Sequence, residues 1–137
     1  MLRRMFAMVA VLLSLAGLAV ASAGPASASS EVSCFGYTGT FADPYPEYPT
    51  VVAADWGYGV DNCFGISPGR HIWSTAPGHP WATIPGDGLA DGISALWETG
   101  TSTAYVKHIQ VWIASSGNYY CQAYTSSVGW NSDWSRC

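Results

Sequence analysis

The sequence has few charged side chains, and basic ones are the scarcest. Charged residues make up 10% of the 137 residues, with five Lys or Arg against nine Asp or Glu. Arg3 and Arg4 stand at the start, so the chain after residue 28 keeps three basic against nine acidic side chains, a formal charge near −6. The three are Arg70, Lys107 and Arg136. So little positive charge argues against nucleic acid or an anionic membrane as a partner.

Sustained helical periodicity is also missing. No window places apolar residues at helical spacing over several turns, and 15 Gly and 8 Pro divide the chain into short segments. The clearest pattern is the alternation over Val106–Ile113, with Ile109 and Val111 on one side and Trp112 on the other. The sequence therefore predicts an all-β fold of short antiparallel strands.

Only the N-terminus carries a long apolar run. A basic start at residues 1–5 is followed by the apolar run Phe6–Val20 and by small residues that fit an A-x-A cleavage site at Ala26–Ala28. The run is shorter than the ~20 residues that span a membrane, which disfavours the alternative of a membrane anchor. We predict a secretory signal peptide at residues 1–28, with cleavage after Ala23 as the second choice. A single secreted domain at residues 29–137, with no membrane association after cleavage, would follow.

The four cysteines all lie after the predicted leader, and no C-x-x-C or H-x-x-x-H spacing suggests a metal or other cofactor. An even count in an exported chain implies two disulfides, with three possible pairings. Cys121 and Cys137 flank a hairpin whose turn is expected near residues 127–129, which favours their pairing. Cys34 is then left to pair with Cys63.

Two hairpin units recur along the chain. Cys63–Thr75 contains a Pro-Gly turn between two apolar runs, and Ile109–Ala123 repeats its pattern. The matched pairs are Phe64 with Val111, Ile66 with Ile113, Gly69 with Gly117, His71 with Tyr119 and Trp81 with Trp130, at offsets of 47 to 49 residues. The sequence thus predicts blade-like repeats at residues 60–86 and 107–137. A small β-sandwich or a barrel is the alternative.

These units also resemble a known family. The first unit has a strand, a turn with Gly, Ile72-Trp73, Pro77-Gly78 and Trp81. The second unit has the similar sequences Val111-Trp112-Ile113 and Gly129-Trp130. Each unit resembles a blade of the tachylectin-type and related bacterial β-propeller lectins. The resemblance covers residues 60–137 and implies carbohydrate binding, with a ring that closes by homo-oligomerisation. The whole chain is also similar to small secreted proteins of filamentous actinobacteria.

Aromatic residues are the strongest compositional bias. Seven Trp, eight Tyr and three Phe follow residue 28, more rings than a core of this size can hide. Flat exposed rings can stack on sugars, so we expect a non-catalytic carbohydrate-binding domain with Trp73, Trp112 and Trp130 as stacking platforms. The same ring types also anchor protein partners. A secreted inhibitor of an extracellular enzyme, presenting the Pro- and Tyr-rich loop 43–49, is therefore the second hypothesis.

A small hydrolase is the third hypothesis. Gly65–Gly69 fits G-x-S-x-G, but no helix pattern follows, so Ser67 is interpreted as a turn residue. Asp87, Asp91 and Glu98 are the carboxylates that could face one another across a cleft. The Gly-rich loop holding the first two lacks the further ligands of a calcium site.

Overall fold

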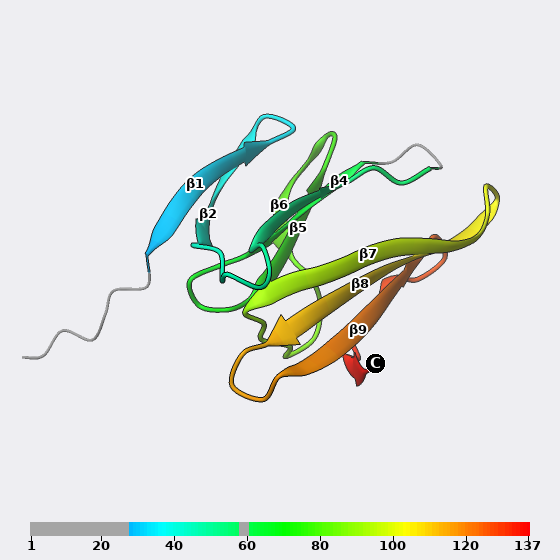
Figure 1. Ribbon diagram of the computed structural model, residues 1–137. Coiled ribbons are helices and arrows are strands. Elements are labelled where there is room, and N and C mark those ends of the chain that lie inside the picture. The colour runs from blue at the N-terminus through cyan, green and yellow to red at the C-terminus, as the bar shows by residue number, and fades with distance from the viewer. Residues whose placement is uncertain (1–27, 58–60) are drawn as a thin grey trace, which may run out of the picture.

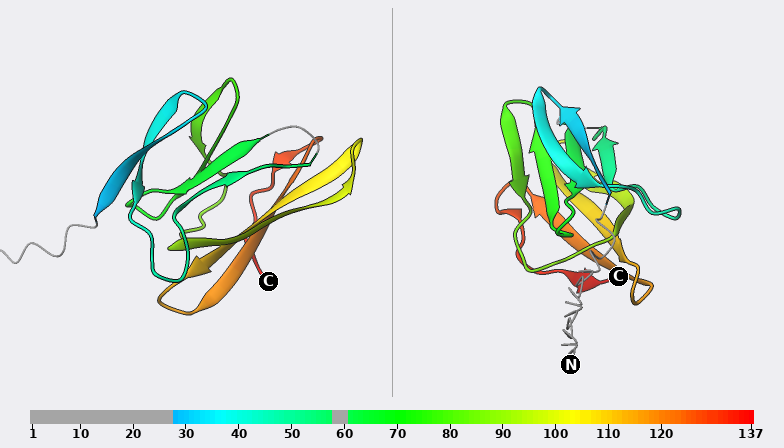
Figure 2. Two further views of the ribbon diagram at one scale, coloured as in Figure 1. Left: turned by 45° about the horizontal axis from the view of Figure 1, so that its top comes forward. Right: turned by 90° about the vertical axis from the view of Figure 1, so that its left-hand side faces the viewer.

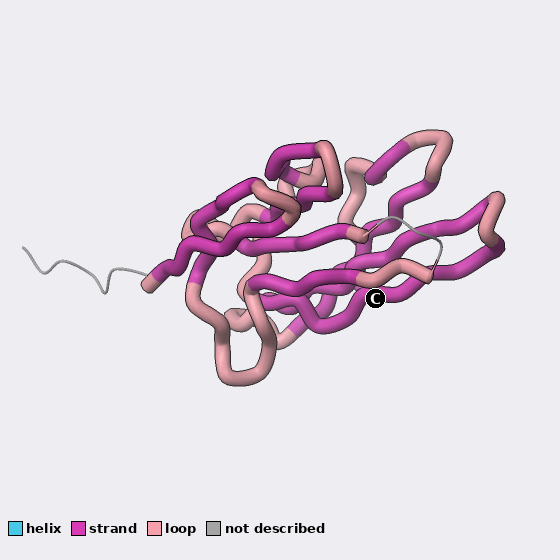
Figure 3. The backbone as a smooth tube through the Cα atoms, turned by 90° about the horizontal axis from the view of Figure 1, so that it is seen from above, coloured by secondary structure: helices cyan, strands magenta, loops and turns pink. Residues whose placement is uncertain are grey.

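The computed structural model describes residues 28–57 and 61–137. All but the last residue of the predicted signal peptide therefore lies outside the described residues. The described chain consists of strands joined by short loops (Figure 3), so the all-β prediction is confirmed. No described segment forms a helix with the length and hydrophobicity needed to cross a membrane.

The strands form three antiparallel groups (Figure 1). The N-terminal hairpin comprises β1 (Ser29–Cys34) and β2 (Tyr37–Ala42). Sheet I has the order β3 (Val51–Ala54), β4 (Asn62–Ile66), β5 (Ile72–Ala76) and β6 (His79–Thr83). Sheet II has the order β7 (Gly92–Thr101), β8 (Ala104–Ile113), β9 (Asn118–Thr125) and β10 (Gly129–Trp130), and β11 (Ser135–Arg136) also pairs with β9.

Sheets I and II share one hydrophobic core. Phe64, Ile66 and Ile72 from sheet I meet Ile109 and Val111 from sheet II, and all five side chains are buried. Both sheets stay open at their edges, so the arrangement is a sandwich of two packed sheets and not a closed barrel.

The two predicted repeats fall in different sheets. Residues 60–86 supply β4, β5 and β6 of sheet I, and residues 107–137 supply most of β8 and all of β9, β10 and β11 of sheet II. Each sheet is a meander whose first four strands follow one another in chain order. Trp81 and Trp130, matched in the sequence, both stand on the fourth strand of their meander.

The N-terminal hairpin forms a third layer on the side of sheet I away from sheet II (Figure 2). Phe41 is 2% exposed, and its ring occupies the space where a Cβ at Gly65 would lie. The centroid of the Trp81 ring lies 4.5 Å from that of Phe41, and Trp81 Nε1 donates a hydrogen bond to the Tyr37 carbonyl at 3.0 Å. The sequence patterns described above did not predict this hairpin.

Both predicted disulfides are present. Cys34–Cys63 joins the N-terminal hairpin to β4, and Cys121–Cys137 ties the C-terminus to β9. Ser135 of β11 lies opposite Cys121, so the second bridge is set by β11 and not by β10. Disulfides of this kind are typical of an oxidising, extracellular-type environment.

Candidate functional site

The outer face of sheet II carries no further layer of strands among the residues that the structure describes. Along β8, Lys107, Ile109 and Val111 are buried in the core, so His108, Gln110 and Trp112 point outward. The N-terminal hairpin covers the outer face of sheet I, but within the described ranges no such hairpin lies over sheet II. We call this outward surface of β7, β8 and β9 the open face.

Trp97 is the most exposed tryptophan of the open face, at 37%. It lies opposite His108 in the β7–β8 register, and the two rings stack with centroids 4.9 Å apart and planes 4° apart. The Oγ1 of Thr99 lies 3.0 Å from His108 Nε2 and fixes the imidazole. Burial lowers the pKa of His108, so the imidazole is uncharged at neutral pH. Trp97 therefore presents a flat ring on a rigid, neutral support.

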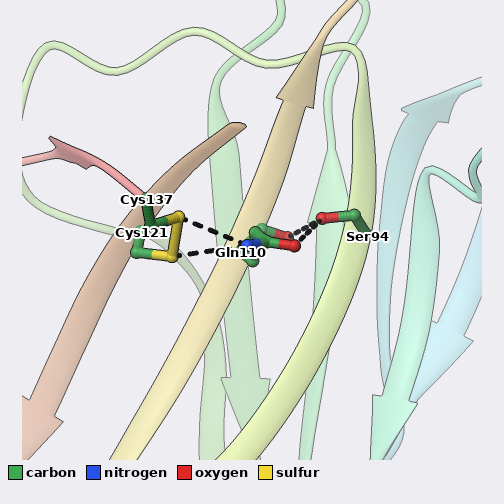
Figure 4. Close-up of a disulfide and its surroundings, with 4 residues drawn as sticks. All are labelled: Ser94, Gln110, Cys121 and Cys137. Atoms are coloured by element: carbon green, nitrogen blue, oxygen red, sulfur yellow. Dashed lines mark hydrogen bonds between the residues drawn. A yellow bond between two sulfur atoms is a disulfide. The ribbon is translucent and has the colours of Figure 1, made fainter. Parts of the chain in front are cut away.

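Gln110 occupies the middle of the open face (Figure 4). Its Oε1 accepts a hydrogen bond from Ser94 Oγ at 2.9 Å, and its Nε2 lies 3.3 Å from Cys137 Sγ and 3.8 Å from Cys121 Sγ. Sulfur is a weak acceptor, so the amide N–H groups are only weakly engaged. The amide is thus held in place with donor capacity for a ligand hydroxyl.

Three tyrosines surround Trp112 at the other end of the open face. The rings of Tyr45 and Tyr48 lie 5.6 and 5.4 Å from it, and Gly92 opposite Trp112 leaves room for Tyr48. The hydroxyls of Tyr48 and Tyr119 are 2.7 Å apart, and this hydrogen bond raises the pKa of Tyr48. Trp112 is therefore half-buried under the Pro- and Tyr-rich loop, while Tyr45 stays 44% exposed.

The two aromatic ends are separated along one strand. His108, beneath Trp97, and Trp112 are four residues apart on β8, which corresponds to about 14 Å. The polar groups of Gln110 and Ser94 lie between them. None of these side chains carries a charge at neutral pH, so the surface is suited to an elongated neutral ligand.

The three predicted stacking platforms do not come together. Trp112 belongs to the open face, but Trp73 pairs with Gly65 and Thr83 on the outer side of sheet I. Trp130 points inward, with its ring 5.7 Å from Phe64. Trp97, which the sequence reading passed over, becomes recognisable once residues 93–98 are treated as a strand paired with β8.

The candidate catalytic groups are also dispersed. Ser67 Oγ accepts the His71 backbone N–H at 3.2 Å, as a turn residue does. Asp91 accepts two hydrogen bonds from Arg70, at 2.7 and 2.9 Å, and one from the Ala114 N–H at 2.8 Å. Asp87 and Glu98 line two separate hollows, of about 560 and 480 Å³. Within residues 28–57 and 61–137, no three His, Cys, Asp or Glu side chains are grouped so as to hold a metal ion.

Comparison with known proteins gives no relative for this chain. No family model, no curated protein and no solved structure matches it. The resemblance of residues 60–137 to β-propeller lectins therefore stays a prediction, as does assembly into a ring. The open face and its residues are what the chain itself offers as a site.

Proposed function

We propose that the protein is a secreted, non-catalytic domain that binds neutral carbohydrate across the open face of sheet II. One observation carries the proposal: Trp97 is an exposed ring held flat by His108 on a rigid pair of strands. A ring that is already ordered loses little conformational entropy on binding. It also offers the apolar C–H surface of a sugar a flat partner.

The polar centre of the open face complements such a ligand. The Gln110 amide and the Ser94 hydroxyl are fixed by their mutual hydrogen bond and can exchange further bonds with sugar hydroxyls. Without charges on this surface, an anionic ligand gains no ion pair. Neutral polysaccharides are therefore the ligand class that this surface fits.

Depletion from solution by a panel of insoluble neutral polysaccharides tests this function. Trp97→Ala should reduce the bound fraction at least tenfold against the polysaccharide that wild type binds, because the flat ring is lost. Trp73→Ala is the matched control, since Trp73 lies on the outer side of sheet I. Equal binding by wild type and Trp97→Ala, or no binding to any polysaccharide, would contradict the proposal.

A second candidate function is inhibition of an extracellular enzyme by the Pro- and Tyr-rich loop 43–49. The observation in its favour is Tyr45, which is 44% exposed in a loop stiffened by Pro44 and Pro46. Tyr45→Ala should then abolish capture of an enzyme from culture medium. The same variant should leave polysaccharide binding largely intact, because Trp97 is at the other end of the open face.

A further inference from the structure

Lys107 is an ionisable side chain buried inside the sandwich. It belongs to β8, points into the core and is only 4% exposed. Its Nζ lies 5.2, 5.7 and 5.6 Å from the ring centroids of Trp56, Tyr105 and Tyr124. Burial lowers the pKa of Lys107, although the negative charge of Glu98 opposes this shift. Burial therefore makes this ammonium easier to deprotonate than that of an exposed lysine, and the uncharged amine is the nucleophilic form of lysine.

The amine faces the side-chain amide of Asn62, at the start of β4. Lys107 Nζ is 3.0 Å from Asn62 Oδ1, which places the amide carbon Cγ within about 4.2 Å of Nζ. Trp56 Nε1 donates a hydrogen bond to the same oxygen at 2.8 Å. The Asn62 Nδ2 group points elsewhere, to the Thr75 carbonyl at 3.3 Å. A nucleophile, a polarised carbonyl and a leaving group are thus arranged around one carbon.

A carboxyl group completes this arrangement. Glu98 of β7 lies directly opposite Lys107 in the β7–β8 register, so both side chains are on the inward face. The Oε1 atom of Glu98 is buried and has no hydrogen-bond partner among the described residues. A buried oxygen without a hydrogen-bond partner costs free energy, so its presence in a folded protein calls for a reason, such as a functional role. Proton transfer to and from the neighbouring amine would supply one.

We propose that Lys107 and Asn62 join in an intramolecular isopeptide bond, with Glu98 carrying the protons. The Lys107 ammonium passes a proton to the Glu98 carboxylate, and the uncharged Nζ attacks Asn62 Cγ. Trp56 Nε1 stabilises the negative charge that develops on Oδ1. The Cγ–Nδ2 bond then breaks as Nδ2 takes a second proton from Nζ. Ammonia leaves and takes up the proton held by Glu98. Overall, the Lys107 ammonium and the Asn62 carboxamide are converted into an amide between the two side chains and a free ammonium ion.

This bond would connect the two sheets. Asn62 is on β4 of sheet I and Lys107 on β8 of sheet II, 45 residues apart in the chain. The two disulfides do not make this connection, since one joins the N-terminal hairpin to sheet I and the other lies at the edge of sheet II. The proposed cross-link would be the covalent tie across the core, and it needs neither oxidant nor metal.

Intact mass spectrometry of the reduced full-length product tests the proposal. The mass of the wild-type protein should be one ammonia molecule below the mass calculated from its sequence. Lys107→Arg keeps the bulk of the side chain but cannot react, so its mass should equal the calculated one. After trypsin, the peptide ending at Arg70 should stay joined to a peptide uncut at Lys107. A succinimide at Asn62 would also lose ammonia but would leave the peptides separate. Full-mass wild-type protein that is cut at Lys107 would overturn the proposal.

Glu98→Gln tests the role assigned to the carboxyl group. This variant should keep the full mass and melt at a lower temperature than wild type, because the cross-link is missing. Glu31→Gln, on the exposed strand β1, is the matched control and should cross-link like wild type. Cross-linking of Glu98→Gln at the wild-type rate would exclude Glu98 as the proton carrier. If this variant does not fold, the mass of the wild-type protein still shows whether the cross-link forms.

Discussion

Replacement of Trp112 by alanine distinguishes a packed ring from a free platform. The sequence suggests an outward ring on β8, and the structure places Tyr45 and Tyr48 against it at 5.6 and 5.4 Å. If the ring is packed in this way, its loss leaves a gap beneath the loop. We therefore expect Trp112→Ala to destabilise the protein as well as to weaken ligand binding.

The expected magnitude follows from partial burial of Trp112. A fully buried Trp costs about 3–5 kcal/mol when it is truncated to alanine. Trp112 is half-buried, and each of its two aromatic contacts contributes about 0.5–1.5 kcal/mol beyond area burial. A cost of about 2–3 kcal/mol is therefore expected. In a domain of roughly 100 residues, this lowers the melting temperature by about 8–12 °C.

Thermal unfolding followed by circular dichroism measures this effect, with disulfides intact. Tyr45→Ala is a useful companion because it removes one ring contact and should cost only about 0.5–1.5 kcal/mol. A loss below about 0.5 kcal/mol for Trp112→Ala, the size typical of surface sites, would refute the packing of the loop on this ring.

Two further predictions concern stability. Burial lowers the pKa of His108 below its ordinary 6.5, so the unfolded state binds more protons below that pH and stability falls as the pH is lowered through it. His108→Gln should therefore lose less melting temperature than wild type between about pH 7 and pH 5, and an equal loss would contradict this. Gly65→Ala would place a methyl group inside the Phe41 ring and should cost about 1–3 kcal/mol, whereas Gly69→Ala meets ordinary contacts and should change little. Equal melting of the two glycine variants would refute the close packing of the N-terminal hairpin.

Local patterns predicted much of sheets I and II. The alternation along residues 106–113 sets the inward face of β8 in both sequence and structure, because one side of the strand must enter the core. The Pro-Gly turn at residues 68–69 and the hairpin before Cys137 likewise depend on nearby residues. The Cys121–Cys137 pairing was predicted from the hairpin between these two residues, and the Cys34–Cys63 pairing followed by elimination.

The features that were missed depend on distant contacts. β1 reads SSEVSC, a polar segment that becomes a strand because it pairs with β2, while Phe41 packs onto Gly65 and Cys34 bonds to Cys63. Trp97 was passed over because a register shift between Ile93 and Ala95 interrupts the alternation of β7. Tyr48 packs against Trp112 although it lies 64 residues earlier in the chain, so a local sequence pattern could not predict this contact either.

Nuclear magnetic resonance during titration with a soluble neutral oligosaccharide tests directly whether the ligand lies on the open face. Each of the seven Trp side chains gives its own indole N–H signal. We predict that the signals of the Trp97 indole and the Gln110 side-chain amide shift most, with smaller changes at Trp112. The Trp73, Trp81 and Trp130 signals should stay in place. Shifts confined to those three residues, or no shift at the Trp97 and Gln110 signals when binding is saturated, would contradict the account.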